Sequence, residues 1–237
     1  MARGMIAGLL LALLIGLGMM PRDTSQTYAQ SVLTWNTGVL SQARGNLSAT
    51  AVGSKIMFAG GIAAGDAGSN VVDIYESTTG AWSVAALSQA RSAMAATTVG
   101  NKALFAGGAA IGGVRSNVVD IYDSTTGTWS TATLSQARYF AAAAAVGGKA
   151  LFAGGDIGGG GRSNVVDIYD SATGTWNTAT LSQARYSVAA AAVGDKALFA
   201  GGDIGGGGRS SVVDIYDSTT GTWSTATLSQ ARDFLSA

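Results

Sequence analysis

The chain has 237 residues, of which 35 are glycine, one is proline and 47% are hydrophobic. Basic and acidic residues number 14 each and give a formal net charge of zero, so the chain lacks the basic face that binds nucleic acid or an anionic membrane surface. Neither cysteine nor histidine occurs, which excludes disulfides, zinc sites with those ligands and imidazole-dependent catalysis. We expect no cofactor.

The N-terminus has the pattern of a secretory signal peptide. Arg3 precedes an uninterrupted apolar run at 5–20, which Pro21 ends. Small residues at positions −3 and −1 predict cleavage before Gln30. We therefore expect residues 1–29 to be removed and the mature chain to be secreted or extracytoplasmic, with no membrane association after cleavage. The alternative is an uncleaved membrane anchor, although the apolar run is shorter than the ~20 residues of a comfortable transmembrane helix.

Internal repetition organises the rest of the chain. With a step of 47 residues, tryptophan recurs at Trp35, Trp82, Trp129, Trp176 and Trp223. The tetrapeptide Ser-Gln-Ala-Arg ends, with the same step, at Arg44, Arg91, Arg138, Arg185 and Arg232. The full repeats are therefore 44–90, 91–137, 138–184 and 185–231. A further repeat starts at 232–237, and 30–43 reads as the stray outer strand of a preceding unit.

Each repeat predicts four short antiparallel strands, and no helical periodicity occurs after residue 30. In the repeat 138–184 we expect strands at 141–146, 149–155, 163–170 and 175–180. A glycine-containing pair between the first two strands is typical of a tight hairpin, and β-branched residues dominate the third strand. Such units in series predict an all-β fold of four four-stranded antiparallel blades, as in a β-propeller.

The order of residues in each repeat resembles the kelch repeat, of the bacterial secreted type. An arginine is followed by an apolar strand that ends in Gly-Gly, then by a tyrosine and, seven residues later, by a tryptophan, as in Tyr122 and Trp129. The resemblance implies a kelch-type β-propeller. The glycine pair would let neighbouring blades approach closely, and the two aromatic residues would fill the space between them.

The number of repeats bears on whether the ring closes. Kelch rings commonly have five to seven blades, whereas this chain has four full repeats, so the resemblance implies an incomplete ring and a truncated chain. A closed four-bladed ring is the alternative. Because open blade edges invite strand pairing, an incomplete ring is expected to self-associate through them.

Positions that differ between otherwise uniform repeats indicate a binding face. They follow the repeated arginine or lie in the loop after the Gly-Gly pair, and the resemblance implies that both kinds of loop share one face of the propeller. The candidate ligand-binding residues are Asn46, Arg115, Tyr139, Phe140, Asp156, Arg162, Tyr186, Asp203 and Arg209. Exposed tyrosine and arginine are suitable anchors for a protein or a glycan. Neutral variation in loops is the alternative explanation.

Charged residues that recur in every repeat are interpreted as structural. Arg138 and Asp167 are expected to pair, and Asp170 to cap the turn before Gly174. The glycine-rich segment 154–162 is not a phosphate-binding loop, because strand sequence follows it where that chemistry requires a helix.

The sequence therefore favours an extracytoplasmic interaction module that binds a protein or glycan through its loop face and performs no catalysis of its own. Two alternatives remain. One is a sugar-modifying enzyme of kelch fold that uses a pair of carboxylates. The other is a truncated repeat fragment without a selected function.

Overall fold

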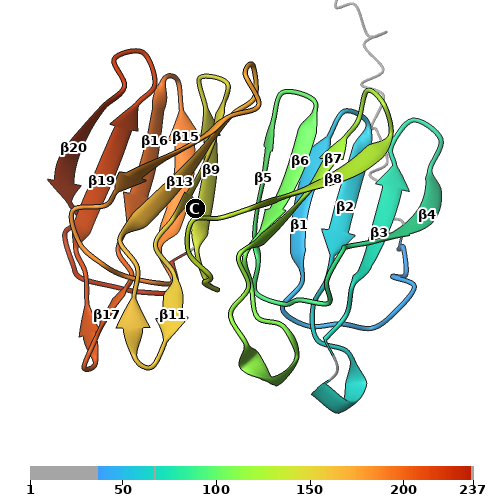
Figure 1. Ribbon diagram of the computed structural model, residues 1–237, viewed down its shortest axis with the longest axis horizontal. Coiled ribbons are helices and arrows are strands. Elements are labelled where there is room, and N and C mark those ends of the chain that lie inside the picture. Colours follow the sequence, from blue (N-terminus) through green and yellow to red (C-terminus); the bar gives the residue numbers. More distant parts are fainter. Residues whose placement is uncertain (1–36, 67, 236–237) are drawn as a thin grey trace, which may run out of the picture. The chain divides into compact units, whose positions relative to one another are not determined.

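Each repeat folds into one antiparallel sheet of four strands, which forms a blade (Figure 1). The structure is a computed structural model that describes residues 37–66 and 68–235. The first blade consists of β1 (Ser48–Val52), β2 (Lys55–Ala59), β3 (Val71–Glu76) and β4 (Ala81–Ala86). The second consists of β5 (Ala95–Val99), β6 (Lys102–Ala106), β7 (Val118–Asp123) and β8 (Thr128–Thr133).

The third and fourth blades follow the same plan. The third contains β9 (Ala142–Val146), β10 (Lys149–Ala153), β13 (Val165–Asp170) and β14 (Trp176–Thr180). The fourth contains β15 (Ala189–Val193), β16 (Lys196–Ala200), β19 (Val212–Asp217) and β20 (Thr222–Thr227). Within every blade, the four strands lie side by side in the sheet in the order in which they occur along the chain. The predicted all-β fold and its four blades are confirmed.

The loops after the Gly-Gly pairs differ between the blades. In the first two blades each holds a short 3-10 turn, η1 (Ala64–Asp66) or η2 (Ile111–Gly113). In the last two, the segment expected as a plain loop forms a small hairpin, β11 (Asp156–Gly158) with β12 (Gly161–Arg162) and β17 (Asp203–Gly205) with β18 (Gly208–Arg209). The glycines at the hairpin tip have positive φ, which lets a two-residue connection close.

Every blade has two apolar faces, because side chains alternate across a strand. One, the valine face, carries Val52, Met57, Val72, Ile74 and Leu87 in the first blade and their equivalents in the others. The other, the aromatic face, carries Phe105, Tyr122 and Trp129 in the second blade and their equivalents in the others. In each of three core clusters, the valine face of one blade packs against the aromatic face of the next. The core therefore lies between the blades.

The innermost strands β1, β5, β9 and β15 pack in that order. Within the described part of the chain the series does not return from β15 to β1, and the ring is not closed. The expected incomplete ring is confirmed, and the alternative of a closed four-bladed ring is wrong. The valine face of the fourth blade and the aromatic face of the first therefore have no covering blade among the described residues.

The Gly-Gly pair sits at the closest approach of two blades, as expected. Gly154 has φ +67°, and a Cβ there would lie 2.5 Å from the carbonyl oxygen of Arg185 in the next blade. The N–H of Gly155 donates to that same carbonyl oxygen at 2.9 Å. Each of the three inter-blade junctions repeats this contact.

The expectations about the N-terminus fall mainly on residues outside the described part. These are the signal peptide at 1–29 and most of the stray strand within 30–43. No strand is formed at 37–43, the portion of this segment that is described. Among the helices of residues 37–66 and 68–235, none has the length and apolar character needed to cross a membrane.

Candidate binding face

The repeated tetrapeptide Ser-Gln-Ala-Arg forms hydrogen bonds that hold the segment leading into each blade. In the third blade, the Arg138 guanidinium donates to the Asp167 carboxylate at 2.5 Å and to the carbonyl oxygen of Phe152 at 2.9 Å. The other carboxylate oxygen of Asp167 accepts the N–H of Ser135 at 2.9 Å. Burial lowers the pKa of Arg138, and the attraction of Asp167 opposes that shift. The expected pairing is confirmed, and its identical form in all four blades marks it as structural.

The outer end of each blade carries a second structural pair. In the third blade, Lys149 donates to Asp170 at 2.5 Å across neighbouring strands. The other carboxylate oxygen of Asp170 accepts the N–H groups of Ala172 and Thr173, and Gly174 follows with φ +72°. The expected turn cap is confirmed. The hydrogen bond from Lys149 is the main cause that lowers the pKa of Asp170.

The candidate loop residues come together as ion pairs that join consecutive blades. Arg115 of the second blade donates to Asp156 of the third at 2.8 Å. Arg162 of the third blade donates to Asp203 of the fourth at 3.0 Å. Arg209 of the fourth blade donates at 2.7 Å to Asp233, at the start of the next repeat. We call these six residues the Arg–Asp array.

Each of the first two arginines also lies over a tyrosine ring. The guanidinium carbon of Arg115 is 4.8 Å from the ring centroid of Tyr139, and that of Arg162 is 5.4 Å from the centroid of Tyr186. At such distances the cation is attracted by the aromatic face. Backbone pairing of Tyr139 with Asp156, and of Tyr186 with the equivalent aspartate, fixes each tyrosine beside the carboxylate of the array.

The electrostatics of the array favour charged arginine and aspartate. The hydrogen bond that Arg115 donates to Asp156 is the main cause that raises the pKa of Arg115. Burial acts to raise the pKa of Asp203, but hydrogen bonds from the Gly205 N–H and from Arg162 outweigh it and hold the pKa below its ordinary value. Burial, reinforced by the neighbouring Asp203, raises the pKa of Tyr186. All three groups therefore keep their ordinary charge states at neutral pH.

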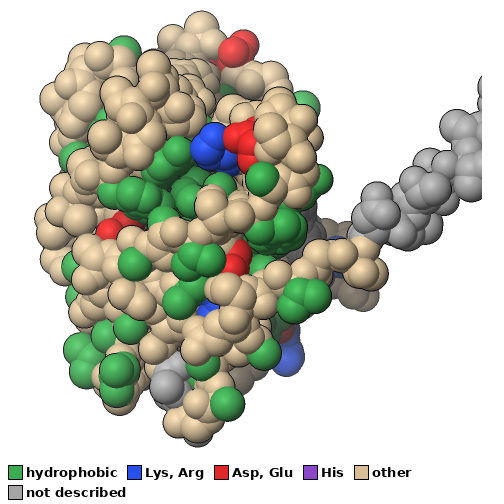
Figure 2. All heavy atoms as spheres, turned by 90° about the vertical axis from the view of Figure 1, so that its right-hand side faces the viewer, with side chains coloured by type: hydrophobic (Ala, Val, Ile, Leu, Met, Phe, Trp, Pro, Cys, Tyr) green, Lys and Arg blue, Asp and Glu red, His purple; other side chains and the backbone are tan. Residues whose placement is uncertain are grey.

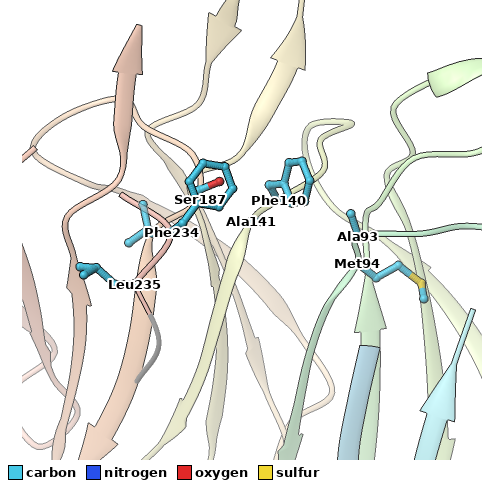
Figure 3. Close-up of a pocket in the computed structure, with 8 residues that line it drawn as sticks. Ala93, Met94, Phe140, Ala141, Ser187, Phe234 and Leu235 are labelled. Atoms are coloured by element: carbon cyan, nitrogen blue, oxygen red, sulfur yellow. The ribbon is translucent and has the colours of Figure 1, made fainter. Parts of the chain in front are cut away.

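An aromatic cluster borders the array. The Phe140 ring lies 4.6 Å from that of Tyr139 and 6.4 Å from that of Tyr186, centroid to centroid. Phe140 also lines an open cavity of about 260 Å³ together with Met94, Val188 and Phe234. Figure 3 shows Met94 and Phe140 on the segments that enter the inner strands β5 and β9, and Phe234 on the segment that follows the fourth blade.

The backbone places these cavity residues in register. Asn46, Ala93, Phe140 and Ser187 occupy the same position of their repeats, and all have φ of 50° or 51°. The N–H of Ala93 donates to the carbonyl of Asn46 at 3.0 Å, and that of Phe140 to the carbonyl of Ala93 at 3.2 Å. The chain of hydrogen bonds continues from Ser187 to Phe140. Each blade thus holds the side chain at this position beside that of the next blade.

The structure therefore unites most of the expected site. Direct contacts link seven of the nine candidate residues: Arg115, Tyr139, Asp156, Phe140, Tyr186, Arg162 and Asp203. Arg209 joins through Asp233, while Asn46 stands at the far end of the hydrogen-bonded series, in the first blade.

Sequence reasoning missed Met94, Phe234 and Asp233. The sequence could have indicated Phe234 and Asp233 as site residues, because they occupy the repeat positions of Phe140 and Tyr139. Met94 carried no comparable signal, because its repeat position had been assigned to the packed inner strand. Among the residues that the structure describes, no cluster of acidic side chains is suited to hold a metal ion.

The fold and the repeated inter-blade contacts define a β-propeller protein of the kelch type. The family description "Kelch motif" matches residues 137–180 and 184–227, and the remaining repeats carry the same glycine, tyrosine and tryptophan positions. Two of the four repeats are thus kelch motifs. The fold of the chain is similar to that of a solved structure titled "Structure of YjhT", with a TM-score of 0.66, 18% sequence identity and coverage of 81% of this chain and 73% of that one. No curated protein matches the chain.

Proposed function

We propose that this kelch-repeat protein is an extracytoplasmic module that binds a protein through the face formed by the Arg–Asp array and its aromatic cluster. A kelch propeller supports protein interaction in general. The observation that carries the specific proposal is the stacking of Arg115 and Arg162 on Tyr139 and Tyr186 beside Phe140. Aromatic and arginine side chains dominate the energetics of protein interfaces.

The array makes these anchors rigid before any partner arrives. The arginines are held by carboxylates at one end and tyrosine rings along their length, so binding would cost little side-chain entropy. The adjoining cavity of about 260 Å³ lies just below the ~300–1,000 Å³ of small-molecule pockets. It suits one apolar side chain of a protein partner better than a whole small molecule. A glycan that stacks on the tyrosines is the competing ligand.

Binding without catalysis is part of the proposal. A carboxylate-based sugar enzyme keeps one acid protonated near neutral pH and leaves the other free to attack or to activate water. On this face Asp156 and Asp203 each accept a hydrogen bond from arginine, and the pKa of Asp203 is lowered. These features support a binding role for the two carboxylates. A glycoside hydrolase screen in which activity appears and is lost in Asp203→Asn would favour the enzyme.

The experiment that tests the binding role is selection on the immobilised chain. A random-peptide library and a glycan array would be applied to the wild type, Phe140→Ser and Thr126→Ala. Serine is tolerated at position 140, because Ser187 has the equivalent position with the same φ. Thr126 is an exposed control in a turn at the opposite end of the strands.

The proposal expects peptides that bind the wild type and Thr126→Ala but lose binding to Phe140→Ser. Glycan binding without peptide binding would assign the face to sugars instead. Peptides that bind all three proteins equally would contradict the choice of this face. Extracytoplasmic location is tested separately by N-terminal sequencing of secreted protein, which should begin near Gln30, whereas recovery of intact Met1 chains in the membrane fraction would contradict it.

A further inference from the structure

The fourth blade leaves a core surface uncovered. Val193 on its valine face is 74% exposed, whereas the equivalent Val52, Val99 and Val146 are between 2% and 6% exposed. The internal valines are covered by the aromatic face of the next blade. Leu198 on the same face is likewise less buried than Leu151, its counterpart in the third blade. This surface therefore keeps the composition of an inter-blade core.

On the first blade, the complementary surface has no cover from residues 37–66 or 68–235. Ile56 on its aromatic face is 38% exposed and Trp82 is 42% exposed. In the later blades the position of Ile56 is an alanine that is fully buried against the preceding blade. Figure 2 shows hydrophobic side chains at the surface on this side of the molecule, where β3 and β4 lie in Figure 1.

Substitutions in the first blade make its uncovered face more apolar, whereas a terminal capping repeat would have a polar outer face. Ile56 replaces the alanine found in the other three blades, and Val84, which is 60% exposed, replaces a threonine. The terminal units of repeat proteins normally carry a polar outer face for solubility. The extra aliphatic carbon at these two positions is consistent with a surface that is buried in the working protein.

We propose that a second copy of this chain covers both surfaces. The aromatic face of the first blade of each copy stacks on the valine face of the fourth blade of the other, in the way that blades already stack three times within one chain. Two copies then close a ring of eight blades, the upper end of the range of about four to eight found in propellers. A head-to-tail contact that closes in this way gives a discrete dimer and leaves no free end for a fibre.

The sequence predicted self-association through open strand edges, whereas the structure points to sheet faces. Each blade already has its four strands, so the large unsatisfied surface is apolar and calls for burial more than for further hydrogen bonds. Contact between faces also fixes how the two copies are oriented, since an aromatic face packs against a valine face in each of the three internal junctions.

Closure requires a local exchange at the junction. The segment 232–235 now rests on the Gly-Gly pair of the fourth blade, where the N–H of Gly202 donates to the carbonyl of Arg232 at 2.9 Å. In the internal junctions this place belongs to the arginine that enters the next blade, so Arg44 of the second copy would take it. In the displaced segment Arg232 and Phe234 are exposed, whereas Asp233 and Leu235 are half-buried. The incoming arginine restores the same hydrogen bond, while the Arg209–Asp233 pair is lost.

Sedimentation velocity over a range of concentrations tests the proposal with the variants Val193→Glu and Ile56→Glu. The wild type should form a dimer that dissociates on dilution. Each variant alone should lose the dimer, because each places a charge in both junctions of the ring. A mixture of the two variants should form a heterodimer held by one junction, in which the intact aromatic face of one copy meets the intact valine face of the other. The second junction then carries both glutamates and stays open. Val114→Glu, at a position 64% exposed in a loop, is the matched control and should still dimerise.

Three sedimentation results would contradict all or part of the proposal. A wild type that stays monomeric at every concentration would overturn the proposal, as would a dimer that persists in Ile56→Glu alone, which would mean contact between like faces. Open-ended larger assemblies would overturn closure at two copies. Circular dichroism melts must show that the variants are folded, and Val193→Ser replaces Val193→Glu if the glutamate prevents folding.

Discussion

Arg138 and Asp167 form an ion pair of 2.5 Å in which the two side chains are 0% and 3% exposed. The same guanidinium binds backbone carbonyls of two strands, while the carboxylate also accepts the N–H of Ser135, at the end of the preceding blade. One buried pair thus joins the strands of its own blade to the chain that arrives from the blade before. The pair explains why the arginine of Ser-Gln-Ala-Arg recurs without change.

Replacing Asp167 by alanine should leave an uncompensated buried charge and cost about 3–5 kcal/mol of unfolding free energy. Combining Asp167→Leu with Arg138→Met should cost less than the sum of the two single substitutions, because no charge then remains buried. Urea melts of the three variants measure this coupling. Additive losses would show that the two residues contribute independently.

Gly154→Ala should destabilise the protein by about 2–5 kcal/mol, since it combines a left-handed backbone with a Cβ pressed against the Arg185 carbonyl. Gly45→Ala is the control, because its φ is outside the left-handed region and no atom lies within 4 Å of the added Cβ. Thermal melts of both variants decide the point. Similar losses at the two positions would contradict the close approach of the blades at Gly154.

Phe105→Ala should cost about 3–5 kcal/mol, the range for truncation of a fully buried large aromatic. Trp129→Ala should cost less, because the tryptophan lies on an outer strand and is only partly buried against the preceding blade. Denaturant melts of the two variants provide the comparison. A larger loss for the tryptophan would mean that the outer strands carry more of the inter-blade core than their exposure indicates.

Acid should weaken the first blade through Glu76. The hydrogen bond from Lys55 lowers the pKa of Glu76 from 4.5 to about 2 in the folded chain. The unfolded chain therefore takes up this proton at higher pH, so the stabilisation is complete above pH 4.5 and is lost as the pH falls toward 2. Glu76→Gln should flatten the dependence of stability on pH in that window only. Parallel curves for the wild type and the variant would show that the pair has no energetic effect.

Much of the fold could be predicted from the spacing of a few residues. The 47-residue step of Trp82 and Trp129 indicated repeated units, and the hairpin glycines and β-branched residues within each unit indicated strands. One detail was not predicted. The segment after Gly155 forms a small hairpin because consecutive glycines can adopt positive φ, and a glycine-rich sequence does not reveal whether it uses that freedom.

The candidate site was predicted as a set of positions but not as an arrangement. Arg115 and Asp156 are 41 residues apart and lie in different repeats, so no local pattern could show that they pair. The sequence was sufficient to separate variable loop residues from the repeated charges, because copies of one unit share whatever their common packing requires.

The sequence by itself determined the number of repeats, their strands, the structural role of the repeated arginine and aspartate, and the absence of histidine and cysteine chemistry. These properties depend on residue identity and on contacts that recur within each unit. Only the tertiary structure decided that the ring stays open, which faces lie uncovered, and that Arg115 lies across Tyr139. Those properties depend on how one blade meets the next, and most positions of the repeats carry the same residue at a covered face and at an exposed one.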